Sequence, residues 1–187
     1  MKTDTLPKRR NAAKTKAKIL AAAQQAFSEQ GYSQAGIRDI AALAEVSSPM
    51  LLRYFGSKSG LFEAALINSI TTEELFTVDK NNFGEKLAEL LTDEKLIINP
   101  PSMITLSTGD SVAREIITRV TEEYLLSPLA QWLGTKDAKI QATEVLMLAM
   151  GFFQFTRQIP LFNNNRKNQQ EINRRFARSV QAIINNT

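Results

Sequence analysis

The 187 residues of this chain include no cysteine and no histidine. The chain therefore has no thiol nucleophile, no imidazole base, no disulfide and none of the usual Cys/His zinc ligands. It also has no glycine-rich phosphate loop and no paired-carboxylate motif, so an enzyme would have to work with Asp, Glu, Lys, Tyr or Ser alone. The sequence predicts a protein that is not an enzyme and that uses neither a metal nor a cofactor.

Long apolar runs are also missing. No stretch approaches the ~20 apolar residues of a membrane span, and the basic N-terminus lacks the apolar core of a signal peptide. Hydrophobic residues still make up 43% of the chain and charged residues 22%, which is an ordinary globular balance. We therefore expect a soluble cytoplasmic protein with no membrane partner.

Positive charge is concentrated at the start of the chain. The formal net charge is +4, but residues 1–60 hold ten Lys or Arg against four Asp or Glu, whereas residues 61–187 hold thirteen against fifteen. A basic end on a near-neutral body is typical of a module that binds a polyanion. A solvated charged surface explains the same counts, so charge alone leaves both interpretations open.

Apolar residues recur at steps of three and four along most of the chain, which predicts an all-α protein. Gly31 stands where the first helix should end, and Pro49 suits the first turn of a later helix. We divide the chain into three parts, a flexible basic arm, a compact three-helix head and a helical body. Their bounds are 1–11, 12–60 and 61–187.

A helix, a three-residue turn and a second helix between Ile37 and Phe55 have the spacing of a helix-turn-helix. Plain helical bundles contain similar pairs, so spacing alone does not decide. Short motifs at fixed offsets add to it: Gly31-Tyr32, Ile37-Arg38-Asp39-Ile40-Ala41, Val46-Ser47, Arg53-Tyr54-Phe55, Ser57-Lys58 and Leu61. With these motifs, residues 31–66 resemble the N-terminal domain of the tetracycline-repressor (TetR) family.

The resemblance implies that the head binds double-stranded operator DNA, with a recognition helix from Ser48 to Tyr54 in the major groove. Tyr54 and Lys58 would contact phosphates, and Lys58 opens a helix whose free N–H groups already favour an anion. The candidate DNA-binding residues are Arg38, Ser47, Ser48, Pro49, Met50, Arg53, Tyr54 and Lys58. The alternatives are a surface ion pair for Arg38, a core role for Tyr54 and a solvated charge for Lys58.

Two departures from the family pattern bear on specificity. Ala35-Gly36 stands where many members have Thr or Ser, which removes a hydroxyl cap and a phosphate contact. Ser48-Pro49-Met50 stands where Lys-Gly-Thr is frequent, and Leu52 replaces a common Tyr. Base recognition would then rely on serine hydroxyls and on apolar contact with thymine methyl groups.

The resemblance also implies a homodimer formed by the last two helices of the body. Residues 142–155 place large apolar side chains around a glycine, where a partner helix can approach closely. The predicted interface residues are Val145, Leu148, Gly151, Phe152, Phe176 and Val180. Packed in a symmetric four-helix interface, they would exclude much apolar surface from water.

Bodies of this family often enclose an effector pocket, and methionine and aromatic side chains shape adaptable apolar cavities. The candidate lining residues are Met103, Leu106, Trp132, Met147, Met150 and Phe153, although each also suits an ordinary core. The sequence thus predicts a repressor released from a palindromic operator by a small apolar or aromatic effector. The alternative is a dimeric DNA-binding regulator whose body senses a protein partner or no ligand at all.

Overall fold

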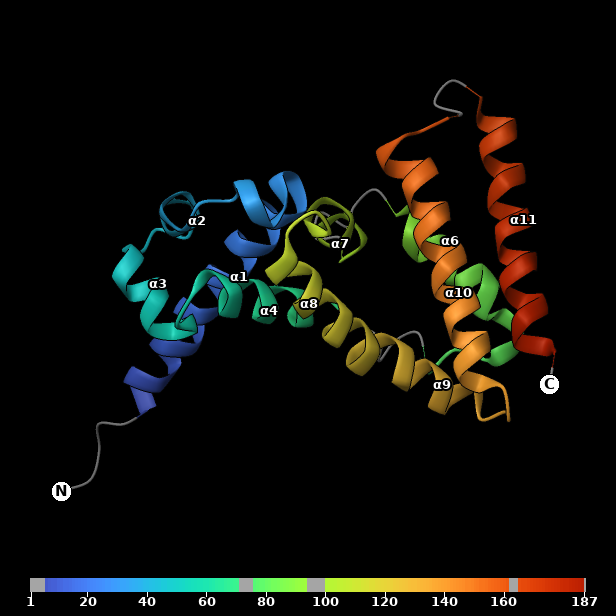
Figure 1. Ribbon diagram of the computed structural model, residues 1–187, viewed down its shortest axis with the longest axis horizontal. Helices are drawn as coiled ribbons and strands as arrows, with labels where there is room; N and C mark the ends of the chain where they lie inside the picture. The colour runs from blue at the N-terminus through green and yellow to red at the C-terminus, as the bar shows by residue number, and fades with distance from the viewer. Residues whose placement is uncertain (1–5, 71–75, 94–99, 162–164, 187) are drawn as a thin grey trace. The chain divides into compact units, whose positions relative to one another are not determined.

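All regular structure in the described residues is helical, as the computed structural model in Figure 1 shows. The structure describes residues 6–70, 76–93, 100–161 and 165–186. Contacts divide the chain into two compact units, here called the N-terminal unit (Met1–Ser69 with Ile97–Val120) and the C-terminal unit (Ile70–Leu96 with Thr121–Thr187). The prediction of an all-α fold is confirmed.

The N-terminal unit is organised around its first helix, which packs against α7, α4 and α2. Its helices are α1 (Leu6–Gln34), α2 (Ile37–Leu43), α3 (Ser48–Phe55), α4 (Lys58–Ser69), α7 (Pro100–Ser107) and α8 (Ser111–Thr121). Ile19, Ala23 and Phe27 follow one another at four-residue steps on α1, and all three are fully buried. This spacing gives α1 the apolar stripe that the other helices cover.

Gly31 marks a break inside α1, with φ of 71°. A Cβ at this position would collide with the backbone carbonyl of Leu106, so α1 and α7 approach each other closely there. Glycine is the residue that tolerates both the positive φ and the close backbone contact. The sequence predicted that the first helix ends at Gly31; the helix is broken there, and a further helical turn continues to Gln34.

The N-terminal unit is larger than the head predicted from the sequence. It continues past residue 60 through the whole of α4 and also takes in α7 and α8. The reason is that α7 covers α1 although the two helices lie far apart in the chain, and helical periodicity gives no information about such a pairing.

The first helix also begins earlier than expected. Of the predicted arm, residues 1–5 lie outside the described residues, while the backbone from Leu6 onward is already helical. Pro7 does not prevent this, because a proline in the first turn of a helix has no N–H bond to lose. Ala12 and Ala13 then continue the helix with the strongest helix-forming residue.

The C-terminal unit buries its own apolar core between α6, α9, α10 and α11. Its elements are the short 3-10 helix η1 (Lys80–Asn82), α6 (Phe83–Thr92), the short π-helix η2 (Glu122–Leu126), α9 (Ser127–Leu133), α10 (Ala138–Phe153), the short π-helix η3 (Gln154–Gln158) and α11 (Arg166–Asn185). Helices α10 and α11 run side by side (Figure 1). None of the helices in the described parts of the chain is long and apolar enough to cross a membrane.

Four residues predicted to form the dimer interface belong instead to this core. Val145, Phe152, Phe176 and Val180 are at most 8% exposed, and the rings of Phe152 and Phe176 stack with centroids 4.0 Å apart. A side chain that its own chain already covers has almost no surface left for a partner. The sequence correctly predicted an apolar face on each of these two helices, α10 and α11, but those faces pack within the unit and not against a partner.

The remaining two predicted interface residues, Leu148 and Gly151, are exposed on α10. Leu148 is 37% exposed, and a Cβ added to Gly151 would meet nothing within 4 Å. Met147 and Phe155 lie beside them along the same helical run, 69% and 52% exposed. We call Met147, Leu148, Gly151 and Phe155 the α10 stripe.

Candidate nucleic-acid interface

Helices α2 and α3 and the turn between them have the arrangement of a helix-turn-helix. The Ala44 amide closes the last turn of α2 on the Ile40 carbonyl at 3.0 Å, and the Val46 amide reaches the Ala41 carbonyl at 2.9 Å. Between them, Glu45 has a φ of 55°, a left-handed conformation that side chains other than glycine adopt at a cost. This turn sets the angle at which α3 leaves α2.

The start of α3 is fixed by a serine cap. Ser47 has an extended backbone, and its Oγ accepts a hydrogen bond of 3.3 Å from the Met50 amide. Pro49 occupies the first turn, where it needs no hydrogen-bond acceptor. Ser47 therefore caps the helix, and the hydroxyl of Ser48 lies outside the cap.

One side of α3 packs on the unit and the other is exposed. Leu51 is fully buried, whereas Met50 and Leu52 are 38% and 39% exposed. Pro49 and Arg53 are exposed as well. The outer side therefore presents apolar groups together with one cation, a combination suited to thymine methyl groups and to a nearby phosphate or guanine.

At the end of α3, Arg53 and Tyr54 lie together. The guanidinium carbon of Arg53 is 5.8 Å from the centroid of the Tyr54 ring, and the Tyr54 side chain is half-buried. Gly56, with φ of 75°, ends the helix. Tyr54 therefore has its ring on the unit and is not a fully buried core aromatic.

Lys58 is the first residue of α4, as the sequence predicted. The preceding Ser57 accepts a hydrogen bond of 3.0 Å from the Gly60 amide and so caps the helix. The N–H groups of a first helical turn and the helix dipole attract an anion, and the lysine ammonium adds a full charge at the same end. This end of α4 is thus suited to binding a phosphate.

The first turn of α2 carries Arg38 and Asp39, both exposed. Gly36 is the N-cap of α2 and supplies no side-chain hydrogen bond, which confirms the predicted loss of a hydroxyl cap. Asp39 lies in the first helical turn, where its negative charge interacts favourably with the helix dipole. Arg38 is free to extend outward from this turn.

Two residues near this surface were not among the predicted ones. Leu52 is exposed next to Met50. An apolar side chain on an amphipathic helix predicts burial, so the sequence did not indicate this exposed position. Lys16 of α1 lies 5.9 Å above the Phe55 ring, close to the end of α3. The run of lysines at positions 14, 16 and 18 was the available signal for this second residue.

Lys18 contributes less positive charge than the sequence suggests, because it pairs with Glu45. Its ammonium lies 2.7 Å from the Glu45 carboxylate. This hydrogen bond, and then the lysine charge, lower the pKa of the Glu45 carboxyl below its ordinary value. The negative charge of Glu45 therefore offsets the charge of Lys18, and the pair has little net charge to offer DNA.

The six candidate effector residues are divided between the two units. Met103 and Leu106 belong to the N-terminal unit, the first fully buried and the second 48% exposed. The other four belong to the C-terminal unit, where Phe153 is buried and Met147 lies on the α10 stripe; the remaining two are Trp132 and Met150. No single unit therefore contains all six residues.

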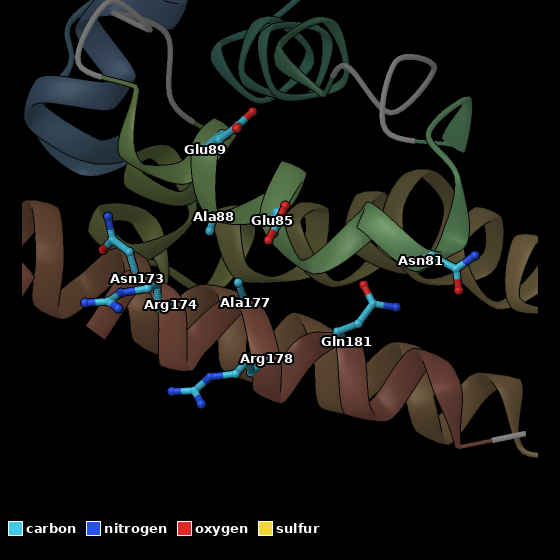
Figure 2. Close-up of a pocket in the computed structure, with 9 residues that line it drawn as sticks. All are labelled: Asn81, Glu85, Ala88, Glu89, Asn173, Arg174, Ala177, Arg178 and Gln181. Carbon is cyan, nitrogen blue, oxygen red and sulfur yellow. The ribbon is translucent and has the colours of Figure 1, made fainter. Parts of the chain in front are cut away.

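The C-terminal unit has an open groove of different character, with a volume of about 570 Å³. Figure 2 shows Ala88 and Ala177 at its floor, between helices α6 and α11. The other lining residues are polar or charged: Asn81, Glu85, Glu89, Asn173, Arg174, Arg178 and Gln181. Gln181 is already occupied, since it accepts from the Gly84 amide at 3.1 Å and donates to the Lys80 carbonyl at 2.8 Å. This groove is not the apolar effector pocket that the sequence predicts.

Comparison with known proteins agrees with this geometry. The family model of the bacterial regulatory proteins of the tetR family matches residues 19–65, from α1 into α4. No curated protein matches the sequence of the chain. Solved structures match over almost the whole chain.

A TetR-family protein from Rhodococcus sp. is 16% identical, with a TM-score of 0.74 and coverage of 92% of this chain and 99% of that one. A TetR-family regulator from Streptomyces coelicolor A3 is 23% identical, with a TM-score of 0.56 and coverages of 92% and 95%. NalD of Pseudomonas aeruginosa, the secondary repressor of the MexAB-OprM multidrug efflux pump, is 20% identical, with a TM-score of 0.60 and coverages of 88% and 96%.

The chain, with a helix-turn-helix unit and a second helical unit, therefore shares its fold with these solved structures. Residues 19–65 match the model of the bacterial regulatory proteins of the tetR family, in the part of the chain that carries the helix-turn-helix.

Proposed function

We propose that this chain is a dimeric DNA-binding regulator that recognises a two-fold symmetric operator through α3 and represses transcription. The observation that carries the proposal is the outer side of the helix-turn-helix. There, the exposed residues of a capped α3 lie one short turn away from a lysine at the start of α4. Such a surface provides base contacts and phosphate contacts together.

The contacts divide by chemistry. Ser48, Pro49 and Met50 open the recognition helix and read base edges, by a hydroxyl hydrogen bond and by apolar contact with thymine methyl groups. Arg53, Tyr54 and Lys58 bind phosphates, and Arg38 supports them from α2. Ser47 contributes as the cap that holds the Met50 backbone in place. Base contacts affect binding to the operator alone, whereas phosphate contacts affect binding to any duplex. Binding measured on operator and on random DNA therefore separates the two kinds of contact.

The α10 stripe supports a homodimer, and it includes two of the six interface residues that the sequence indicated, Leu148 and Gly151. Met147, Leu148 and Phe155 are large apolar side chains left exposed along one helix, and Gly151 between them gives a partner helix room to approach. An exposed apolar stripe of this kind is costly in water unless another surface covers it. A two-fold dimer through α10 would cover it and would present two copies of α3 to DNA.

Release by a small apolar effector remains part of the proposal, and the repressor NalD among the structural neighbours is consistent with repression. The second candidate is a regulator whose body senses a protein partner or no ligand. The charged lining of the groove between α6 and α11 favours this second candidate over an apolar ligand at that place. Thermal melting of the purified protein with libraries of apolar and aromatic compounds would separate the two, because a specific ligand raises the melting temperature by mass action.

The decisive experiment is selection of bound duplexes from random DNA, followed by binding isotherms across a salt series. We expect a palindromic site with half-sites about one helical turn, ~34 Å, apart or at a related spacing. Affinity should fall steeply with salt as counterions are released. A protein that enriches no duplex over random sequence, at low or moderate salt, would contradict the proposed function.

Lys58→Ala provides the matched variant for this experiment. It should weaken specific and random DNA together and reduce the salt slope by about one unit per bound subunit, since one fewer phosphate is neutralised. An exposed lysine of the C-terminal unit, Lys136, is the control for a change of charge alone. Lys136→Ala should leave the salt slope unchanged, and an equal drop in both variants would mean that Lys58 makes no specific phosphate contact.

A further inference from the structure

The ammonium group of Lys58 is held in place by the end of α1. Its Nζ lies 4.8 Å from the centroid of the Tyr32 ring and donates a hydrogen bond of 3.3 Å to the backbone carbonyl of Ser33. A cation over an aromatic face is attracted by the ring quadrupole. A free lysine side chain samples many rotamers, so these two contacts restrict where the charge of Lys58 can be.

The Tyr32 ring is itself fixed by the core of the N-terminal unit. Phe27 stacks on it with centroids 6.2 Å apart, and Phe62 of α4 meets it edge to face at 5.2 Å. Its backbone N–H donates a hydrogen bond of 2.9 Å to the Oγ of Ser107, which is 1% exposed. The ring therefore has little freedom to turn away from the lysine.

The helix that follows α7 completes the support. The Ser33 hydroxyl donates to Oδ2 of Asp110 at 3.4 Å, and Oδ1 of Asp110 caps α8 by accepting from the Val112 amide at 2.9 Å. Burial, and next the Asp110 charge, raise the pKa of the Tyr32 phenol above its ordinary value. The phenol thus stays protonated, and the lysine faces a neutral ring.

We infer that Tyr32 is a positioning residue for DNA binding: its ring, with the Ser33 carbonyl, holds the Lys58 ammonium at the N-terminus of α4, ready for a phosphate. The inference rests on the proposed function. A donor already held in place loses less conformational freedom on binding, and this raises the affinity without a new contact to DNA.

A double-mutant cycle on the full chain tests the inference, with random-sequence duplex DNA as the probe. Tyr32→Leu should weaken binding by about two- to fivefold in the presence of Lys58, as expected for an exposed cation–π contact. In the Lys58→Ala background, the same substitution should change binding little, because the group that it positions is gone. Tyr32→Phe keeps the ring and should retain most of the affinity.

A general loss of structure in Tyr32→Leu would weaken binding equally in both backgrounds, and that result would overturn the inference. An increase in affinity would overturn it as well, since it would mean that the ring withholds the lysine from DNA. Melting temperatures of all four proteins accompany the cycle and report any loss of folding.

A second measurement does not depend on the folding of a variant or on DNA. Protons above an aromatic face are shielded, so the ε-methylene protons of Lys58 should resonate upfield of those of exposed lysines such as Lys139 in the wild-type protein. An unshifted Lys58 signal would refute the contact. If the wild-type chain binds no duplex but the shift is present, the proposed function fails and the positioning contact stands.

Discussion

The two units of this chain use the same kind of amphipathic helix in opposite ways. In the N-terminal unit, α3 keeps Leu51 in the core and presents Pro49, Met50 and Arg53 outward, as the motif predicts. In the C-terminal unit, Val145 of α10 is buried within the unit while Met147, two residues later, is 69% exposed. A stripe of apolar residues shows that a helix packs on one face. It does not show whether its own chain or a partner provides the other surface.

The largest expected effect comes from a charge in the core of the C-terminal unit. Val180→Glu buries a carboxylate without a partner at a fully buried position, and it should destabilise the fold by about 3–5 kcal/mol. Denaturant unfolding followed by circular dichroism measures this. If the Val180→Glu protein were fully folded but monomeric, Val180 would belong to the dimer interface and not to the core of the unit.

A charge on the exposed face of the same unit should instead change assembly. Met147→Glu leaves the core intact but puts a carboxylate at the most exposed side chain of the α10 stripe, so the dimer dissociation constant should rise by about 30-fold or more. Sedimentation velocity across a concentration series gives this constant. Val112→Glu on α8, at a position 46% exposed in the N-terminal unit, is the matched control and should leave the assembly unchanged. Wild-type protein that is monomeric at micromolar concentration would rule out the stripe as an interface.

On the outer side of α3, shortening the side chain of Met50 should weaken binding to the operator but not to random DNA. Met50→Ala removes a proposed contact with a base edge and should cost roughly 1–3 kcal/mol on the selected operator while sparing random DNA. Paired isotherms on the two duplexes measure the difference. Equal weakening on both would assign Met50 to general support of the helix.

The smallest expected effect concerns the turn of the helix-turn-helix. Glu45 has φ of 55°, so Glu45→Gly removes backbone strain, whereas Glu45→Ala removes the same ion pair with Lys18 and keeps the strain. The glycine variant should melt about 2–4 °C above the alanine variant. Calorimetry of the two variants isolates the backbone term, and equal melting temperatures would show that the turn is unstrained.

Much of the nucleic-acid interface could be predicted because its determinants are local. The Ser47 cap acts three residues along the chain on Met50, and Lys58 opens a helix directly after its own cap, Ser57. Gly36 leaves α2 without a side-chain cap, because glycine has no side chain that could accept a hydrogen bond. Each of these features depends on neighbouring residues, so the order of residues was enough to indicate it.

The positions that the sequence did not indicate depend on distant contacts. Tyr32 meets Lys58 through space, and its amide reaches Ser107, a residue 75 positions away. In the C-terminal unit, the amide of Gln141 donates to the carbonyl of Asn186 at 2.7 Å and so fixes α10 against the end of α11. Periodicity predicts which face of a helix is buried, but it does not predict which distant residue packs against that face.

The sequence by itself determined the helices, the helix-turn-helix and the resemblance of residues 31–66 to the TetR family, since capping, periodicity and short motifs act within a few turns of the chain. Only the tertiary structure decided that Val145 and Val180 are core residues, that Met147 and Phe155 are exposed, and that Tyr32 holds Lys58. The physical reason is that each helix has several faces of similar hydrophobicity, and the choice among them minimises the exposed apolar surface of the whole unit. That choice depends on every helix in the unit at once.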